Sequence, residues 1–252
     1  PAPLKARILG HLGFAGVIEQ RFDSAFAALE ARSFVEDVLV RDLGAHHVAA
    51  GHDFHFGAGR RGTPAFLLDS GREGHFGVSV VEAFRDEGGE TVSSSRIRAA
   101  LAAGDVAAGA ALLGYRFTVE ATVSGGRRLG RTLGFPTANM ALPPETALAE
   151  GVYAVRFRRA SGALHDGVAS YGRRPTVETD GAAVLETSLF DFDGDLYGET
   201  AAVSIFGRLR GEEKFDGLAP LVAQMTRDAE QARALLAGAM PLSPLDEMVC
   251  FR

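Results

Sequence analysis

A loop rich in glycine and arginine runs directly into an extended segment in the stretch GGRRLGRTLGFPTANM, residues 125–140. Side chains alternate between two faces along an extended strand, so Thr137 and Asn139 point to the same side. Their hydroxyl and amide oxygens converge there, and Mg²⁺ commonly takes only one or two oxygen ligands from protein. Pro136 fixes its own φ and stiffens the backbone beside the pair. The spacing therefore predicts a magnesium site at Thr137 and Asn139.

The loop that precedes this pair has the composition of a phosphate-binding segment. Glycines let backbone amides approach a phosphate closely, and arginines add positive charge. We interpret the segment as a loop that covers the phosphates of a nucleotide. The same residues also fit a solvated basic hairpin followed by an edge strand, and composition does not decide between the two. The residues concerned are Gly125, Gly126, Arg127, Arg128, Gly130, Arg131 and Gly134.

A single glutamate interrupts an otherwise apolar segment nearer the C-terminus. Glu186 lies in AVLETSLFDF, whose other residues are mostly apolar or small. Buried glutamates are rare unless they are paired or functional, which makes Glu186 a candidate functional residue. Period-two alternation does not decide which face it occupies, and a solvated glutamate on an edge strand fits the pattern as well.

The composition is that of an ordinary soluble globular chain, with 252 residues, 46% hydrophobic and 23% charged. Its apolar runs are far shorter than the roughly 20 residues that span a bilayer, and its start does not read as a secretion signal. Cys250 is the single cysteine, so an internal disulfide cannot form. The net charge of −6 argues against broad electrostatic capture of nucleic acid. We expect a cytoplasmic protein that acts on small molecules, without nucleic acid or membrane partners; self-association cannot be read from the sequence.

The first part of the chain alternates short apolar runs with helical patterns, which is typical of parallel-sheet α/β units. Ser33 is a plausible N-cap and Gly44 a plausible stop for the helix between the first two strands. We expect an α/β module at residues 1–114. Its predicted strands are residues 16–22, 46–51 and 76–84, and its predicted helices are residues 33–44 and two short helices within 93–114.

From Tyr115 onward, short β-rich runs are separated by glycine and aspartate turns, without helices between them. This pattern predicts a small antiparallel barrel at residues 115–252. A final helix, residues 218–238, carries Leu221, Met225 and Ala229 on one stripe and should pack across the barrel. The predicted strands include residues 116–123, 151–159, 166–172, 184–192 and 200–209.

GRTLGFPTAN resembles the nucleotide-binding signature of riboflavin kinases, which lack a Walker-type loop. The resemblance continues through GVYAV, GVASYGRRPTV, LETSLFDFDGDLYG and LRGEEKFDGLAPLVAQMTRD, and covers residues 115–236. It implies a six-stranded antiparallel barrel with a C-terminal helix, ATP as donor, riboflavin as acceptor, FMN as product and Mg²⁺ as cofactor. It also implies that Glu186 takes the proton from the ribityl 5'-hydroxyl during direct in-line transfer, and that GRRPT and the final helix lie near the flavin.

The first module resembles the adenylyltransferase half of the bifunctional bacterial FAD synthetases, which has a Rossmann-like, nucleotidyltransferase-type sheet. AAGHDFHFGAGRRG and VSSSRIRAAL carry this resemblance. It implies that Asp53, Ser94, Ser95 and Arg98 contribute to nucleotide and phosphate binding. The two segments also fit simpler interpretations, a strand ending in a glycine turn and an N-capped helix. A metal site at His52, Asp53 and His55 is a further alternative.

The chain departs from that family at one motif. The family carries G-x-F-D-G-x-H-x-G-H near its start, and those histidines stabilise charge on the attacked α-phosphate. No His-x-Gly-His occurs in this sequence. The α/β module is therefore expected to be partial and not to adenylylate FMN at a useful rate, either because the chain is a fragment of a bifunctional enzyme or because its gene has lost that half.

Three functions remain open from the sequence. The first is an ATP-dependent riboflavin kinase, within a fully bifunctional enzyme if the native protein has the missing region. The second is a flavin-binding or carrier barrel without catalysis. The third is a barrel that binds RNA through the arginine loop, which requires stacking aromatics and a basic patch that this acidic chain does not show. We favour the kinase.

Overall fold

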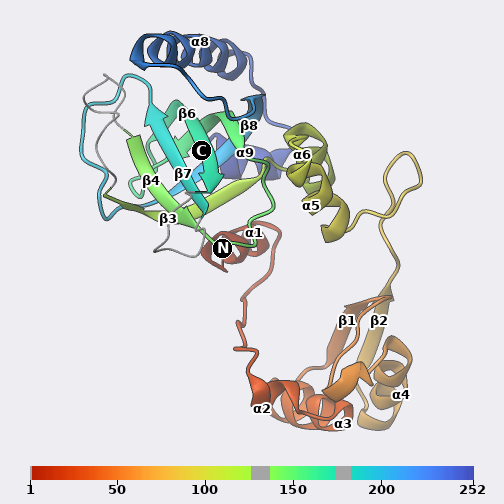
Figure 1. Cartoon of the computed structure of the whole chain (residues 1–252). Coiled ribbons are helices and arrows are strands. Elements are labelled where there is room, and N and C mark those ends of the chain that lie inside the picture. The colour runs from red at the N-terminus through yellow and green to blue at the C-terminus, as the bar shows by residue number, and fades with distance from the viewer. Residues whose placement is uncertain (1, 126–136, 174–182) are drawn as a thin grey trace. The chain divides into compact units, whose positions relative to one another are not determined.

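The structure is a computed structural model that describes residues 2–125, 137–173 and 183–252 (Figure 1). Contacts divide it into two compact units, residues 18–92 and a second unit formed by residues 1–17 together with 93–252. Each unit is described by itself below. The boundary expected between residues 114 and 115 stays a prediction. It divides two family modules, whereas the compact units are defined by contacts within the fold. Among the described residues, no helix combines the length and apolar character that a membrane span requires.

The unit of residues 18–92 is built around two parallel strands, β1 (His47–Gly51) and β2 (Gly77–Val81). Parallel neighbours need a crossover connection, which α4 (Pro64–Gly74) provides. Its core contains Val35, Phe56 and Leu67. The strands predicted at residues 46–51 and 76–84 are confirmed, and the helix predicted at residues 33–44 is present mainly as a π-helix, whereas α4 was not predicted. The shorter elements are α2 (Ser24–Ala27), α3 (Ala31–Ser33), a π-helix (Phe34–Asp42) and a 3₁₀-helix (Ala58–Arg60).

Two local predictions in this region are wrong. Residues 16–22 form no strand, and Ile18 and Phe22 are 74% and 77% exposed. A strand needs a neighbour to pair with, and in the described part of this unit β1 and β2 pair only with each other. Ser33 makes no capping hydrogen bond, because α3 already precedes the π-helix, whereas Gly44 does end the helical segment with φ of +59°.

The second unit contains a closed six-stranded antiparallel barrel, with strand order β3-β4-β7-β6-β5-β8. Closure leaves no strand edge unpaired. The predicted barrel is thus confirmed, together with the α/β plus β fold class. Its strands are β3 (Thr118–Ser124), β4 (Thr137–Leu142), β5 (Gly151–Arg158), β6 (Leu164–Arg173), β7 (Ala183–Leu189) and β8 (Thr200–Arg210).

Alternation along β4 and β7 separates the barrel core from its outer face. Ala138 and Met140 of β4 and Leu185 of β7 belong to the core cluster. Since side chains alternate, Thr137 and Asn139 of β4 and Glu186 of β7 point outward. The face that the sequence left open for Glu186 is therefore the outer one.

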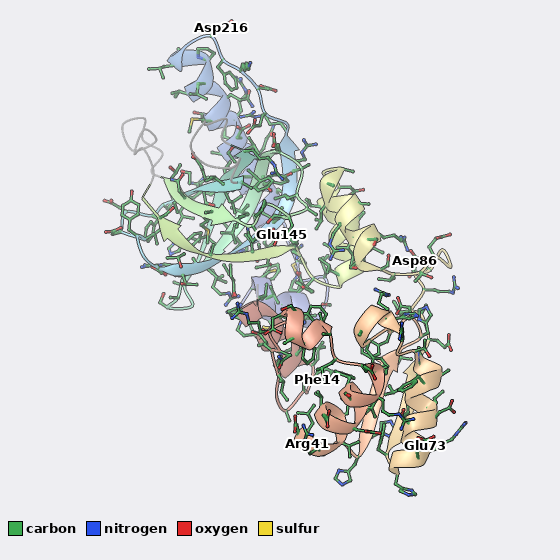
Figure 2. All side chains as sticks on the ribbon, turned by 60° about the horizontal axis from the view of Figure 1, so that its bottom comes forward. Phe14, Arg41, Glu73, Asp86, Glu145 and Asp216 are labelled. Atoms are coloured by element: carbon green, nitrogen blue, oxygen red, sulfur yellow. The ribbon has the colours of Figure 1, made fainter. Side chains whose placement is uncertain are left out.

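Helices surround the barrel within the same unit. α5 (Ser94–Ala102) is capped by Ser93, and α6 (Val106–Leu113) ends at Gly114, which has φ of +77°. α8 (Leu218–Ala237) lies across β5, β6 and β8 (Figure 1). Figure 2 shows Asp216 at the outer end of α8. α1 (Ala2–His11) packs against α9 (Pro244–Cys250).

Candidate active site

The register of the barrel brings three predicted site residues onto one patch of its outer face. Asn139 on β4 lies directly opposite Glu186 on β7, and Thr137 lies opposite Ser188. On the other side of β7, Ser170 of β6 is the partner of Glu186. Directly opposed residues have Cβ atoms about 4.5–5.5 Å apart. A hydroxyl, an amide and a carboxylate therefore share a small area, although Asn139 and Glu186 are 47 positions apart in the chain.

A cavity of about 380 Å³ lies between this outer face and α8; we call it the α8 cavity. Leu221, Met225 and Ala229 line it, whereas the buried residues of α8 are Asp228, Ala232 and Leu236. The apolar stripe expected to pack on the barrel therefore lines an open space instead. The other described residues of its wall are Thr137, Val152, Val168, Ser170, Glu186, Ser188, Phe190, Arg210, Glu212, Glu213, Phe215 and Asp228.

A second cavity, of about 390 Å³, opens inside one end of the barrel; we call it the barrel-end cavity. Ala138, Thr187 and Ala169 are neighbours across β4, β7 and β6. Ala138 and Thr187 are in the cavity wall, and their side chains are small. The described residues of its wall are Val123, Thr137, Ala138, Thr187, Leu189, Phe192, Asp193, Gly194, Asp195, Leu196 and Tyr197.

Thr137 lines both cavities. Glu186 lines only the α8 cavity, and Asn139, which is 5% exposed, is in neither described wall. Two spaces of similar size, each large enough for a small molecule, therefore share Thr137 in their walls, and Glu186 lines one of them. This arrangement can bring two small molecules together at Thr137.

A buried ion pair fixes the wall of the α8 cavity. The Arg210 guanidinium donates two hydrogen bonds to Asp228 Oδ2, at 2.8 and 3.1 Å, and one to Oδ1 at 3.0 Å. Gln224 Nε2 also donates to Asp228 Oδ1, at 2.8 Å. Hydrogen bonding to Asp228 raises the pKa of Arg210 above its ordinary value. Asp228 is 2% exposed, so the pair fastens α8 to the end of β8 beside Glu186.

Several predicted nucleotide-binding residues lie outside the described residues, and their roles stay predictions. Thr137, Asn139 and Glu186 are described and lie together, but their chemical roles also remain predictions. The residues outside the described ranges are Gly126, Arg127, Arg128, Gly130, Arg131, Gly134 and Pro136.

The residues predicted for adenylylation are divided between the two units. Asp53 lies in the turn after β1, where its backbone oxygen is 2.8 Å from His55 Nδ1. Ser94, Ser95 and Arg98 are on α5, and Arg98 Nη1 lies 3.4 Å from Ser94 Oγ. In the described ranges, no three His, Cys, Asp or Glu side chains are grouped to hold a metal ion. The alternative metal site at residues 52–55 therefore has no support.

Sequence reasoning missed Thr187 and the Arg210–Asp228 pair. An aspartate among apolar residues on the inner side of a predicted helix is a usable signal, because an unpaired buried carboxylate is rare. Thr187 carries no comparable signal, since its setting depends on which residues lie across β4 and β6. The register of a closed barrel is not readable from one strand.

The comparisons with known proteins agree on both parts of the chain. A riboflavin kinase family model matches residues 113–236, and an FAD synthetase model matches residues 1–96. The chain is 40% identical over 232 residues to the bifunctional riboflavin kinase/FMN adenylyltransferase of Escherichia coli (strain K12), covering 91% of this chain and 72% of that protein. The Bacillus subtilis (strain 168) protein of the same name is 33% identical over 240 residues, covering 91% and 73%.

One solved structure is similar over most of the chain. It is titled as a macrolide-efflux protein from Streptococcus pneumoniae, with a TM-score of 0.76 and 34% identity. The match covers 92% of this chain and 74% of the other. The similarity therefore extends over nearly the whole of this chain.

Proposed function

Since the chain belongs to the family of bifunctional riboflavin kinase/FMN adenylyltransferase enzymes, we propose that it transfers the γ-phosphate of ATP to the 5'-hydroxyl of riboflavin and releases FMN. The observation that carries this proposal is the pair of cavities that share Thr137, one of which contains Glu186. A phosphoryl transfer between two small molecules needs two such spaces and one meeting point.

The position of Glu186 supports an assignment of the two substrates to the two cavities. A general base must lie within hydrogen-bond reach of the hydroxyl that it deprotonates, so the acceptor belongs in the α8 cavity. Phe190, Phe215 and Met225 give that cavity the apolar wall that a flavin ring requires. ATP then belongs in the barrel-end cavity, with its γ-phosphate at Thr137.

Glu186 would accept the proton of the ribityl hydroxyl as the oxygen attacks the γ-phosphorus and ADP leaves. Such a base contributes about 10²- to 10⁴-fold in rate. The remaining rate enhancement depends on positioning and on neutralising phosphate charge. We expect the arginines and glycines at residues 126–134 to help neutralise the phosphate charge.

The described residues fit Mg²⁺. Thr137 offers a hydroxyl oxygen and Asn139 an amide oxygen on the same face, and the carboxylate of Glu186 lies opposite Asn139. An all-oxygen set of this kind is what Mg²⁺ prefers, with water and phosphate oxygens completing the shell. Thr137 and Asn139 would hold the ion, and when bound it supplies positive charge beside the phosphates.

The proposed substrates are small molecules, and we propose a cytoplasmic location without a role in nucleic-acid binding. We do not propose FMN adenylylation for this chain acting alone. Its sequence contains no His-x-Gly-His, and losing one preorganised donor to a developing oxyanion typically costs about 10²- to 10³-fold in rate.

The test is to incubate the full chain with riboflavin, ATP and Mg²⁺ and to follow flavins by chromatography. FMN formation proportional to protein, and absent without ATP, is the expected result. Riboflavin binding with no ATP-dependent product would instead indicate a flavin-binding barrel. In a parallel reaction with FMN and ATP, we expect no FAD, and FAD formation proportional to protein would show that the chain is bifunctional.

A further inference from the structure

Thr187 has a buried hydroxyl that the fold itself does not use. Its side chain is 0% exposed, and Oγ1 has no hydrogen-bond partner in the part of the chain that the structure describes. Leaving a buried polar group unpaired is destabilising, and most such groups in proteins are paired. An orphaned hydroxyl on a cavity wall therefore indicates a partner that arrives from the cavity.

Thr118 shows how the same barrel treats a structural threonine. Thr118 is 4% exposed, and its Oγ1 donates to the backbone oxygen of Arg116 at 2.9 Å and lies 2.8 Å from Ser204 Oγ. Thr187 has instead two alanines as its neighbours on the inner face, Ala138 and Ala169. Neither alanine side chain can pair with its hydroxyl, and Ala138 lines the same cavity.

The wall of the barrel-end cavity defines what can occupy the space beside Thr187. Leu189, Phe192 and Leu196 are apolar or aromatic and suit a flat ring. Asp193 and Asp195 lie on the same wall, and carboxylates disfavour the negative charge of phosphates nearby. The wall therefore suits the apolar parts of a nucleotide, and Thr187, which lies opposite Ala138, is within one register position of Thr137.

We propose that Thr187 is a binding residue for the phosphate donor, and that its hydroxyl forms a hydrogen bond with a polar atom of the nucleotide. This inference rests on the proposed kinase function. A hydroxyl both donates and accepts, so a ribose hydroxyl or a nitrogen of the purine satisfies it. A site built to hydrogen bond its substrate discriminates against ligands that lack the matching atom.

The test uses Thr187→Val, which removes the hydroxyl and keeps the shape, beside Thr187→Ser, which keeps the hydroxyl. ADP and riboflavin affinities are measured by calorimetry, and thermal unfolding is measured without ligand. For Thr187→Val we expect the Kd of ADP to rise about 5- to 10-fold, with the Kd of riboflavin within about 2-fold and an unchanged or higher unfolding midpoint. Thr187→Ser should bind ADP within about 3-fold of the unaltered chain.

Thr118→Val is the matched control, because it removes a buried hydroxyl that has partners. Its unfolding midpoint should fall while its ADP affinity stays unchanged. Thr187→Val should weaken ADP binding without lowering the unfolding midpoint, whereas Thr118→Val should lower the midpoint without weakening ADP binding. This contrast separates a ligand-binding hydroxyl from a structural one. A Thr187→Val chain with a lowered midpoint and unchanged ADP affinity would assign the hydroxyl to the fold.

The remaining outcomes separate this inference from the proposed function. If the unaltered chain forms FMN but Thr187→Val binds ADP equally well, the binding role of Thr187 is wrong and the kinase function stands. If Thr187→Val weakens riboflavin and not ADP, the cavity holds the other substrate and the inference is wrong. If the unaltered chain binds ADP but forms no FMN, the kinase function fails, while the ADP affinities still test the hydroxyl.

Discussion

Asn139 and Glu186 face each other across β4 and β7 on the outer surface of the barrel. The pairing places an amide that we assign to the metal beside a carboxylate that we assign to the acceptor hydroxyl. Because the two strands are hydrogen bonded along six paired positions, the spacing of the two side chains is fixed by the backbone. Positioning of this kind is what phosphoryl transfer requires from a protein.

Glu186→Gln should lower the turnover of riboflavin by at least about 10²-fold, because it removes a base while keeping the shape of the side chain. The Kd of riboflavin should stay within a few-fold of its original value. Turnover is measured by FMN chromatography and the Kd by flavin fluorescence.

Glu199→Gln is a suitable control for this change. Glu199 is also in the barrel unit, but its carboxylate pairs with Arg159 at 2.9 Å and lines neither cavity in the described residues. We expect this variant to lose some stability and to keep its turnover. Unchanged turnover in Glu186→Gln would make Glu186 an ordinary polar residue of the outer face.

FMN formation should require a divalent ion, and Thr137→Val should raise the Mg²⁺ concentration for half-maximal rate by about tenfold or more. The reason is that the variant loses one of two protein oxygens offered to the ion. Rates are measured over a Mg²⁺ titration, with excess chelator as the zero point.

The control for Thr137→Val is Thr122→Val on β3, whose hydroxyl contacts Thr200 at 3.3 Å. Its Mg²⁺ dependence should match that of the unaltered chain. Full activity in excess chelator, or identical titrations for both variants, would show that Thr137 does not hold the ion.

The sequence predicted the features that depend on local pattern. Alternation placed Thr137 and Asn139 on one face, turn residues separated the barrel strands, and Gly114 ended α6. The structure confirms these predictions, because in the closed barrel every strand has a neighbouring strand on each side to pair with.

The remaining features depend on contacts that one segment does not reveal. The run that contains Ile18 and Phe22 has a strand pattern but no strand beside it. The stripe that contains Met225 reads as a packing face, yet it lines a cavity. The face of Glu186 and the orphaned hydroxyl of Thr187 both follow from the register of three strands.

Asp228→Asn should destabilise the barrel unit by about 2–3 kcal/mol, because it breaks a buried ion pair and leaves Arg210 with a weaker partner. Arg210 keeps 16% of its side chain exposed, which limits the loss through solvent screening. Urea unfolding measures the effect. Because α8 also forms the cavity wall, the Kd of riboflavin should rise as well.

Asp191→Asn provides the comparison for Asp228→Asn. Asp191 pairs with Arg233 of the same helix at 2.8 Å, but it is 80% exposed. Surface pairs of this kind contribute little to stability, so the unfolding midpoint should barely change. Equal losses in the two variants would show that burial of Asp228 does not matter.

Stability should fall as the pH rises from about 9 to about 11, in part through Cys250. Burial raises the pKa of the Cys250 thiol from 9.0 to about 11. The unfolded chain therefore loses this proton at a lower pH than the folded chain, which favours unfolding above about pH 9. Below that pH the thiol is protonated in both states and its contribution to stability is fully present.

Urea unfolding of the unaltered chain and of Cys250→Ala over this pH range isolates the thiol. Burial also raises the pKa of Tyr115, Tyr153 and Tyr171, so both chains should lose stability at high pH. The alanine variant should have a lower free energy of unfolding below pH 9, because Cys250 is 1% exposed in the core with α1 and its loss leaves a cavity. The difference in free energy of unfolding between the two chains should then shrink between about pH 9 and about pH 11, since only the unaltered chain carries the thiol. A constant difference across that range would show that the Cys250 proton is not linked to folding.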